Sequence, residues 1–171
     1  MPEQTPDFGS VLAALNAAQV RFLLVGGLAM VSHGSAHITQ DIDVVYARDA
    51  DNLAALERGL APYHPRLRGV PEEVPFMLDA PTLRNTRNLT LETTLGDLDL
   101  LSDIAGMDSF EGLWERSVEM DIEGIPVRVA SLDDLIAMKR AANRPKDRLH
   151  LMELLALRKL IQQETEHRER P

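Results

Sequence analysis

Residues 21–46 read RFLLVGGLAMVSHGSAHITQDIDVVY. The apolar run at 22–25 predicts a buried strand, and the glycine pair at 26–27 predicts a tight turn into a short helix. A polar loop follows, and then a second strand that begins with Asp41 and Asp43. Because side chains alternate between the two faces of a strand, these two carboxylates project side by side.

The paired carboxylates and the glycine turn together indicate chemistry on nucleotides. Like charges on one strand repel each other, which costs stability unless a cation neutralises them. Hard cations such as Mg²⁺ prefer carboxylate oxygens and also bind substrate phosphates. Gly26 and Gly27 allow the backbone to approach a ligand closely, and free N–H groups at a helix start favour phosphate. Glycines at such turns are also common for steric reasons alone, so the phosphate role depends on the carboxylates.

This ordered combination resembles the signature of the DNA polymerase beta nucleotidyltransferase superfamily. That signature is an apolar residue with two small residues, then Asp-apolar-Asp-apolar, here residues 25–27 and 41–44. The closer resemblance is to the minimal and AbiEii-like nucleotidyltransferase groups. Their shared run corresponds here to Gly26, Gly27, Ala29, His33, Gly34, Thr39, Asp41 and Asp43. Related sequences often have Arg where this chain has His37, so a fixed cation is either missing there or pH-dependent.

The resemblance implies a magnesium-dependent enzyme that transfers NMP from an NTP such as ATP to a hydroxyl acceptor. Asp41 and Asp43 would hold two Mg²⁺ ions, and a third carboxylate would help to activate the acceptor hydroxyl. Asp97 and Asp99 share one face of a later strand, and Asp99 is chosen because leucines flank it well inside the strand. The alternative for either residue is an exposed edge-strand charge that discourages aggregation.

Nucleotide contacts are expected from the glycine turn, the loop and the C-terminal helices. The candidates in the turn and the loop are Gly26, Gly27, Ser35 and His37. Residues 131–139 resemble a Ser-Leu-x-Asp-Leu-Ile-x-Met-Lys pattern of these proteins. Lys139 is therefore the candidate for a triphosphate contact, and Asp147 would orient it. Arg84 and Arg87 are weaker candidates, and a solvated basic face is the ordinary alternative.

The composition indicates one cytoplasmic domain. The 171-residue chain has no cysteine, which suits a reducing compartment, and neither a signal region nor an apolar run of membrane-spanning length is expected. Residues 139–171 hold nine Lys or Arg and five Asp or Glu, a charge of +4, against a formal net charge of −9 for the chain. The acidic remainder argues against broad nucleic-acid binding. The acceptor stays open between a tRNA end, a protein and a small molecule, and a toxin–antitoxin partner is among the implied partners.

The expected fold class is α/β (α+β), a mixed sheet flanked by helices with a helical C-terminal portion. Residues 1–130 would form the nucleotidyltransferase core, and residues 131–171 would pack on it as C-terminal helices within a single compact domain. Five prolines in residues 61–81 predict an irregular excursion with a short helix near 76–78. The charged tail from Glu164 is expected to fray. The remaining strands are expected at 88–94, 97–101, 118–122 and 125–129, and helices at 49–60, 107–116, 131–143 and from 145, after a first helix capped by Asp7 or Ser10.

Two other functions compete with the transferase. The first is a catalytically silent module that binds a nucleotide or a partner, for example within a toxin–antitoxin pair. The second is a metal-dependent phosphohydrolase, which the same carboxylates would support.

Overall fold

The computed structural model describes residues 7–169. In this range seven strands form one mixed sheet in the order β3-β4-β5-β2-β1-β7-β6. The pairs β1–β7 and β2–β5 are parallel, and the other neighbours are antiparallel. The strands are β1 (Phe22–Val25), β2 (Ile42–Tyr46), β3 (Arg66–Leu67), β4 (Asn88–Thr93), β5 (Gly96–Leu101), β6 (Val118–Ile122) and β7 (Ile125–Val129).

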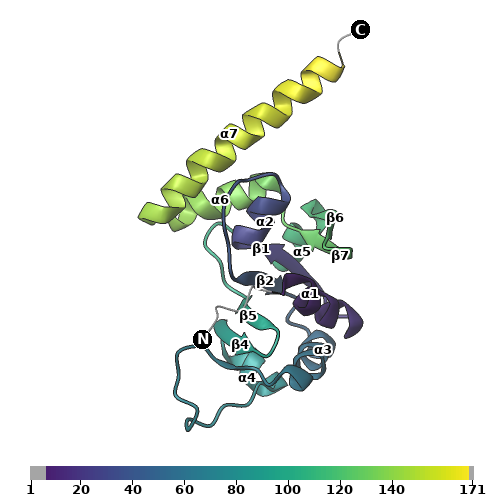
Figure 1. Cartoon of the computed structure of the whole chain (residues 1–171), viewed down its shortest axis with the longest axis vertical. Helices are drawn as coiled ribbons and strands as arrows, with labels where there is room; N and C mark the ends of the chain where they lie inside the picture. Colours follow the sequence, from purple (N-terminus) through teal and green to yellow (C-terminus); the bar gives the residue numbers. More distant parts are fainter. Residues whose placement is uncertain (1–6, 170–171) are drawn as a thin grey trace.

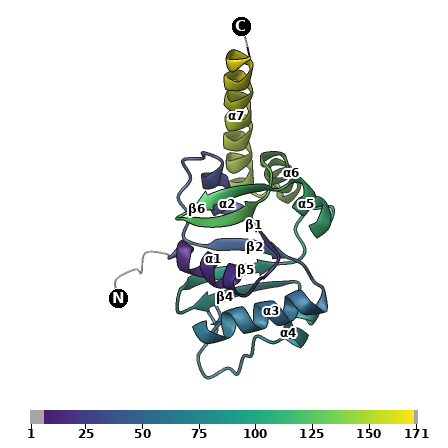
Figure 2. The ribbon, with the colours of Figure 1, turned by 90° about the vertical axis from the view of Figure 1, so that its right-hand side faces the viewer.

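Helices cover the sheet and extend beyond it (Figures 1 and 2). They are α1 (Phe8–Ala17), α2 (Gly26–Ser32), α3 (Ala50–Leu60), α4 (Ala80–Asn85), α5 (Phe110–Arg116), α6 (Leu132–Ala142) and α7 (Pro145–Arg168), with a 3-10 turn at Ala61–Tyr63. Helix α1 contacts α3, β5 and β7, whereas α2 contacts β1, β2 and α6. Helix α7 packs on α6, and its C-terminal half projects away from the sheet (Figure 1).

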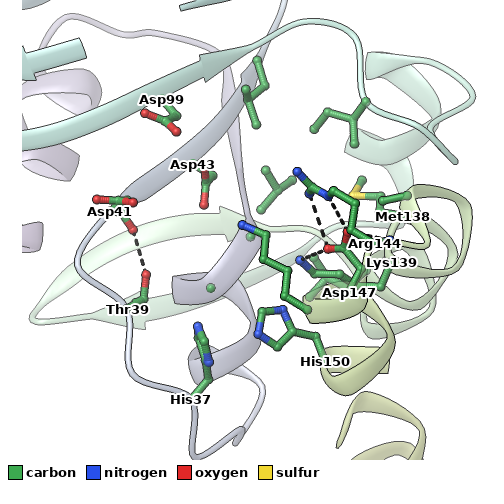
Figure 3. A pocket seen from close by; sticks show the side chains of 18 residues that line it. His37, Thr39, Asp41, Asp43, Asp99, Met138, Lys139, Arg144, Asp147 and His150 are labelled. Carbon is green, nitrogen blue, oxygen red and sulfur yellow. Dashed lines mark hydrogen bonds and ion pairs between the residues drawn. The ribbon is translucent and has the colours of Figure 1, made fainter. Parts of the chain in front are cut away.

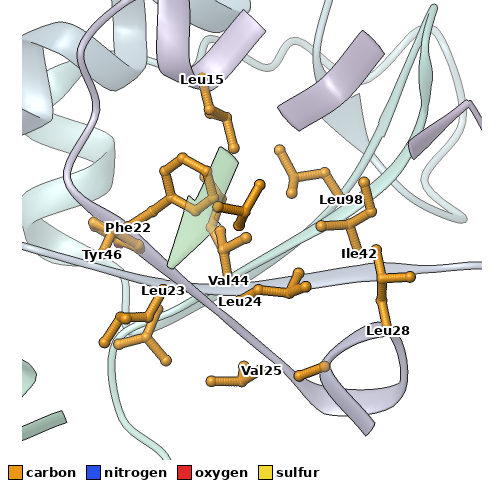
Figure 4. Packing of buried hydrophobic residues seen from close by; sticks show 14 of the residues in the cluster. Leu15, Phe22, Leu23, Leu24, Val25, Leu28, Ile42, Val44, Tyr46 and Leu98 are labelled. Atoms are coloured by element: carbon orange, nitrogen blue, oxygen red, sulfur yellow. The ribbon is translucent and has the colours of Figure 1, made fainter. Parts of the chain in front are cut away.

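The core is built around the central strands. All four residues of β1 are buried, as expected for a strand covered on both faces. Figure 4 shows Leu15 of α1 beside Phe22 on one side of β1, together with Val44 of β2 and Leu98 of β5. These side chains are at most 4% exposed, so the close packing around β1, β2 and β5 fixes the positions of the residues at the strand ends.

The predicted fold class is confirmed, and most elements begin where the sequence places their caps. Asp7, Asp49 and Ser131 each accept a hydrogen bond from a backbone N–H in the first turn of the helix that follows. Helix α6 ends at Asn143, which adopts the left-handed conformation (φ 49°) typical of a C-cap. The predicted domain boundary at residue 130 falls in the connection between β7 and α6.

Three local expectations are wrong. The helix expected near residues 76–78 instead begins at Ala80, because Asp79 accepts from the Thr82 N–H and Pro81 occupies the first turn. Within the proline-rich excursion, β3 pairs with β4, and this strand was not expected. The tail from Glu164 continues α7 to Arg168.

Within residues 7–169, none of the helices combines the length and apolar character needed to cross a bilayer.

Candidate active site

Two parallel strands bring three predicted carboxylates to one pocket. The register of β2 and β5 places Asp43 directly opposite Asp99, and Asp41 comes one residue before β2 begins. Neighbouring strands lie about 4.8 Å apart, so paired residues project from the same face as close neighbours. Asp41, Asp43 and Asp99 all line a pocket of about 290 Å³ (Figure 3). Of the two candidates for the third carboxylate, Asp99 lines this pocket and Asp97 does not.

The glycine pair allows α2 to begin directly against these carboxylates. Gly26 has φ +66°, and a Cβ atom there would collide with Asp43 Oδ2. A Cβ atom on Gly27 would meet Thr39 Oγ1 at 2.8 Å. Any side chain at Gly26 would therefore collide with Asp43 and strain the backbone, which gives this glycine a steric reason in addition to the predicted phosphate role. Both glycines line the pocket.

The electrostatics of the pocket are those of crowded, half-buried carboxylates. Burial, followed by repulsion from Asp99 and Asp41, raises the pKa of Asp43 to about 6. Lys139 and the Gly27 N–H act in the opposite direction. Burial also raises the pKa of Asp99, although the Arg68 guanidinium opposes that shift. In the neutral pH range, the protein thus holds negative charges that stabilise a bound cation but destabilise the cation-free fold.

Basic side chains from α6 and α7 form the opposite wall. Lys139 Nζ donates to Asp147 Oδ1 at 3.1 Å, and Arg144 Nε donates to Asp147 Oδ2 at 2.6 Å (Figure 3). Asp147 is fully buried, whereas the Lys139 side chain is 16% exposed. Asp147 thus connects the end of α6 to the start of α7 and fixes Lys139 at the pocket wall, which also includes Lys146.

Of the two nucleotide-binding candidates in the loop between α2 and β2, His37 lies at the pocket and Ser35 does not. His37 lines the pocket, with its ring edge-on to His150 of α7 at a centroid distance of 4.6 Å (Figure 3). Burial, Lys139 and His37 together lower the pKa of His150. Ser35 is absent from the pocket lining, and its hydroxyl donates to Glu153 Oε1 at 2.5 Å. In this conformation Ser35 holds the loop to α7.

Sequence reasoning missed two charged or titratable neighbours of the carboxylates. His150 lies three residues after Asp147 on α7, which is the spacing of one helical face, so the sequence carried a weak signal for it. Arg68 follows β3, and its Nη2 donates to Asp99 Oδ1 at 2.7 Å. Nothing in the local sequence indicates that contact. Arg84 and Arg87 do not line the pocket, and Arg87 pairs with Asp103 at the surface.

The donor set fits a hard divalent cation. Asp41, Asp43 and Asp99 line one pocket, and burial together with repulsion from the other two raises the pKa of Asp43, a cost that a bound cation would relieve. Among residues 7–169, no three Asp, Glu or His side chains yet stand close enough to share one ion. One oxygen of Asp99 is already bound by Arg68.

Comparison with protein families assigns the chain. Residues 10–164 match the family described as "Nucleotidyltransferase of unknown function (DUF6036)". The chain belongs to this nucleotidyltransferase family. No curated protein matches the sequence of this family member.

Solved structures share the fold of this DUF6036 nucleotidyltransferase. Lincomycin-bound LnuA, a lincosamide antibiotic adenylyltransferase, is 14% identical, with 88% of this chain and 96% of that chain covered at a TM-score of 0.58. The antibiotic-resistance factor ANT(2'')-Ia in solution is 16% identical, with 97% and 95% covered and a TM-score of 0.54. A putative nucleotidyltransferase from Thermotoga maritima is 14% identical, with 95% and 91% covered and a TM-score of 0.50. At these identities the likeness concerns the fold alone.

The raised pKa of Asp43 makes the stability of the nucleotidyltransferase depend on pH. A carboxyl group whose pKa rises on folding, from 3.8 to about 6, binds its proton more tightly in the folded state, so stability falls as pH rises through that window. In EDTA, Asp43→Asn should unfold like the wild type at pH 4 and be more stable at pH 8, by about 3 kcal/mol. Urea unfolding at several pH values measures this, with Glu115→Gln as an exposed control. A difference that does not change with pH would contradict the prediction.

Proposed function

We propose that this protein is a divalent-cation-dependent nucleotidyltransferase that moves NMP from an NTP to the hydroxyl of a small-molecule acceptor. The supporting observation is the division of the pocket. Asp41, Asp43 and Asp99 line one part of the pocket and the basic side chains at the α6–α7 junction line another, and the Gly26–Gly27 turn also lines it. This arrangement suits a substrate whose phosphates would contact the basic side chains and would also bind a cation held by the carboxylates.

Asp41, Asp43 and Asp99 would hold Mg²⁺. When bound, Mg²⁺ would neutralise phosphate charge and lower the pKa of a hydroxyl next to it. The choice of ion rests on the donor set, which consists of carboxylate oxygens alone.

The protein's own side chains would then bind and orient the triphosphate. Lys139, fixed by Asp147, would contact the triphosphate as a point charge, and the glycine turn would let the chain approach it closely. An apolar wall would receive the rest of the nucleotide and exclude water. It is formed by Val25, Leu101, Ile104, Leu135, Met138 and Ala142.

The transfer itself is a single displacement at phosphorus. The acceptor oxygen would form a bond to the α-phosphorus while the bond from that phosphorus to the bridging oxygen breaks, which releases pyrophosphate. The hydroxyl proton would pass to Asp99. Catalysis would come mainly from positioning and from charge stabilisation in the pocket.

The small-molecule acceptor and the adenylyl group are proposed from the structural neighbours. LnuA is an adenylyltransferase whose structure contains lincomycin. A structure of ANT(2'')-Ia contains adenylyl-2''-tobramycin, and it is 17% identical to this chain with a TM-score of 0.51. The acidic character of residues 1–138 agrees with a compact acceptor better than with a long RNA.

Labelled nucleotides test the proposal. The protein is incubated with Mg²⁺, a panel of hydroxylated small molecules, bulk tRNA and cell protein, and ATP labelled at either the α- or the γ-phosphate. We expect label from α-labelled ATP, and none from γ-labelled ATP, on a small molecule. Label on tRNA or protein would support nucleotidyl transfer but contradict the proposal that the acceptor is a small molecule. Release of inorganic phosphate alone would favour a phosphohydrolase, and no turnover would favour the silent module.

A further inference from the structure

The third carboxylate of the pocket already has a cationic partner from its own chain. Arg68 Nη2 donates to Asp99 Oδ1 at 2.7 Å, and Arg68 Nε lies 3.0 Å from Asp97 Oδ2. The Asp99 side chain is 16% exposed and that of Arg68 is 28% exposed, so solvent only partly screens this ion pair. A guanidinium thus already binds one of the two Asp99 oxygens that a divalent cation would use.

Arg68 belongs to a segment that pairs with the sheet through only two residues, while Leu78 near its C-terminal end is buried in the core. Residues 64–79, which we call the strap, contain the two-residue strand β3 and pair with β4 at the sheet edge. Beyond Arg68, residues 69 and 71–75 are exposed, and Gly69 has φ +74° with open space around it. Such short edge pairing with exposed flanks is expected to open at low free-energy cost.

Arg68 contacts the two carboxylates in different ways, which makes it feasible for a cation to replace Arg68 at Asp99. Within residues 7–169, no acceptor is aligned with the Arg68 Nε–H, so its contact with Asp97 is an ion pair without a directed hydrogen bond. If Arg68 lost Asp99, it would still have Asp97 as a counter-ion in the same place. Release of Asp99 therefore does not leave Arg68 as an unpaired charge.

We propose that Arg68 is an internal competitor of the divalent cation, which holds Asp99 until cation binding displaces Arg68 and loosens the strap. This inference rests on the proposed function, because it assumes that the pocket binds a divalent cation. It makes Arg68 a positioning residue that acts through Asp99. A cation with two charges that interacts with Asp41, Asp43 and Asp99 together has an electrostatic advantage over a guanidinium that holds Asp99 alone.

Metal affinity in the absence of substrate tests the competition. Isothermal titration of the full chain with Mn²⁺ should show tighter binding by Arg68→Gln, by roughly five- to tenfold, because the cation no longer displaces a partner from Asp99. Arg68→Lys, which keeps the charge but loses the fork, should fall between Arg68→Gln and the wild type. Arg66→Gln is the matched control, since Arg66 is on the same strap and pairs with Glu72 and Glu92; it should stay within about twofold of the wild type.

Hydrogen exchange supplies a second readout that a merely structural role for Arg68 would not produce. The Arg68 N–H donates to Thr90 O at 2.9 Å, and saturating Mn²⁺ should speed exchange in residues 64–79 of the wild type while leaving β5 unchanged. Unchanged or weaker Mn²⁺ binding by Arg68→Gln, or slower exchange in the strap, would overturn this inference alone. If neither the wild type nor Arg68→Gln binds Mn²⁺ more tightly than Asp43→Asn does, the proposed function fails together with it.

Discussion

Asp43→Asn should abolish nucleotidyl transfer, with a loss of about a thousandfold or more in turnover, while the protein stays folded. Asp43 lies between the other two carboxylates, because it is opposite Asp99 in the β2–β5 register and two residues from Asp41. An amide keeps the shape of the side chain but loses the charge that binds the cation. Three decades in rate correspond to about 4 kcal/mol of transition-state stabilisation, a reasonable share for one ligand of a catalytic cation.

The measurement is the initial rate of label transfer from α-labelled ATP at saturating Mg²⁺, with thermal unfolding recorded for the same preparation. Asp103→Asn is the matched control, since Asp103 lies just beyond β5 but pairs with Arg87 at the surface and does not line the pocket. We expect the control to keep its rate within about twofold, because an exposed ion pair contributes little. More than a tenth of wild-type activity in a folded Asp43→Asn protein would contradict the role of Asp43.

The sequence was most informative where one short stretch carries both the structural and the chemical signal. The buried run before Gly26, the glycine turn and the alternation around Asp43 are all local, so the β1-α2-β2 unit follows from periodicity and turn chemistry. The helix starts at Asp49 and Ser131 are equally local, because a cap involves residues only a few positions apart. Asp99 was preferred over Asp97 because leucines flank it, and Asp99 does lie at the pocket.

The parts that sequence reasoning missed depend on contacts between distant segments. Strand β3 has two residues, too few for a periodic pattern, and the nearby prolines argued only against a long helix or a central strand, whereas β3 lies at the sheet edge. Arg68 reaches Asp99 across 31 positions of sequence, so a single sequence gives no means of pairing them. Ser35 was expected at the nucleotide, yet it donates to Glu153 of α7, a partner 118 positions away. Such pairs become visible only when the topology is known.

The stability of the C-terminal helices should depend on one buried carboxylate, and Asp147→Asn should lower the free energy of unfolding by about 3 kcal/mol. Asp147 is fully buried between Lys139 and Arg144. Although burial raises its pKa, the hydrogen bonds from Arg144 and Lys139 prevail and lower the pKa to about 2. Removing the charge leaves Lys139, whose side chain is only 16% exposed, without its counter-ion at the α6–α7 junction.

The pH dependence and a neighbouring ion pair make this prediction specific. A carboxyl group whose pKa falls on folding stabilises the fold above its unfolded pKa, so the deficit of Asp147→Asn should be complete above about pH 4 and shrink as pH falls toward 2. Asp133→Asn is the matched control, because Asp133 of α6 pairs with Arg158 of α7 across the same two helices but at the surface, and it should cost less than about 1 kcal/mol. Urea unfolding of the three proteins between pH 2.5 and pH 8 decides the matter. Equal losses for the two variants would mean that burial gives Asp147 no special role in holding Lys139 at the pocket.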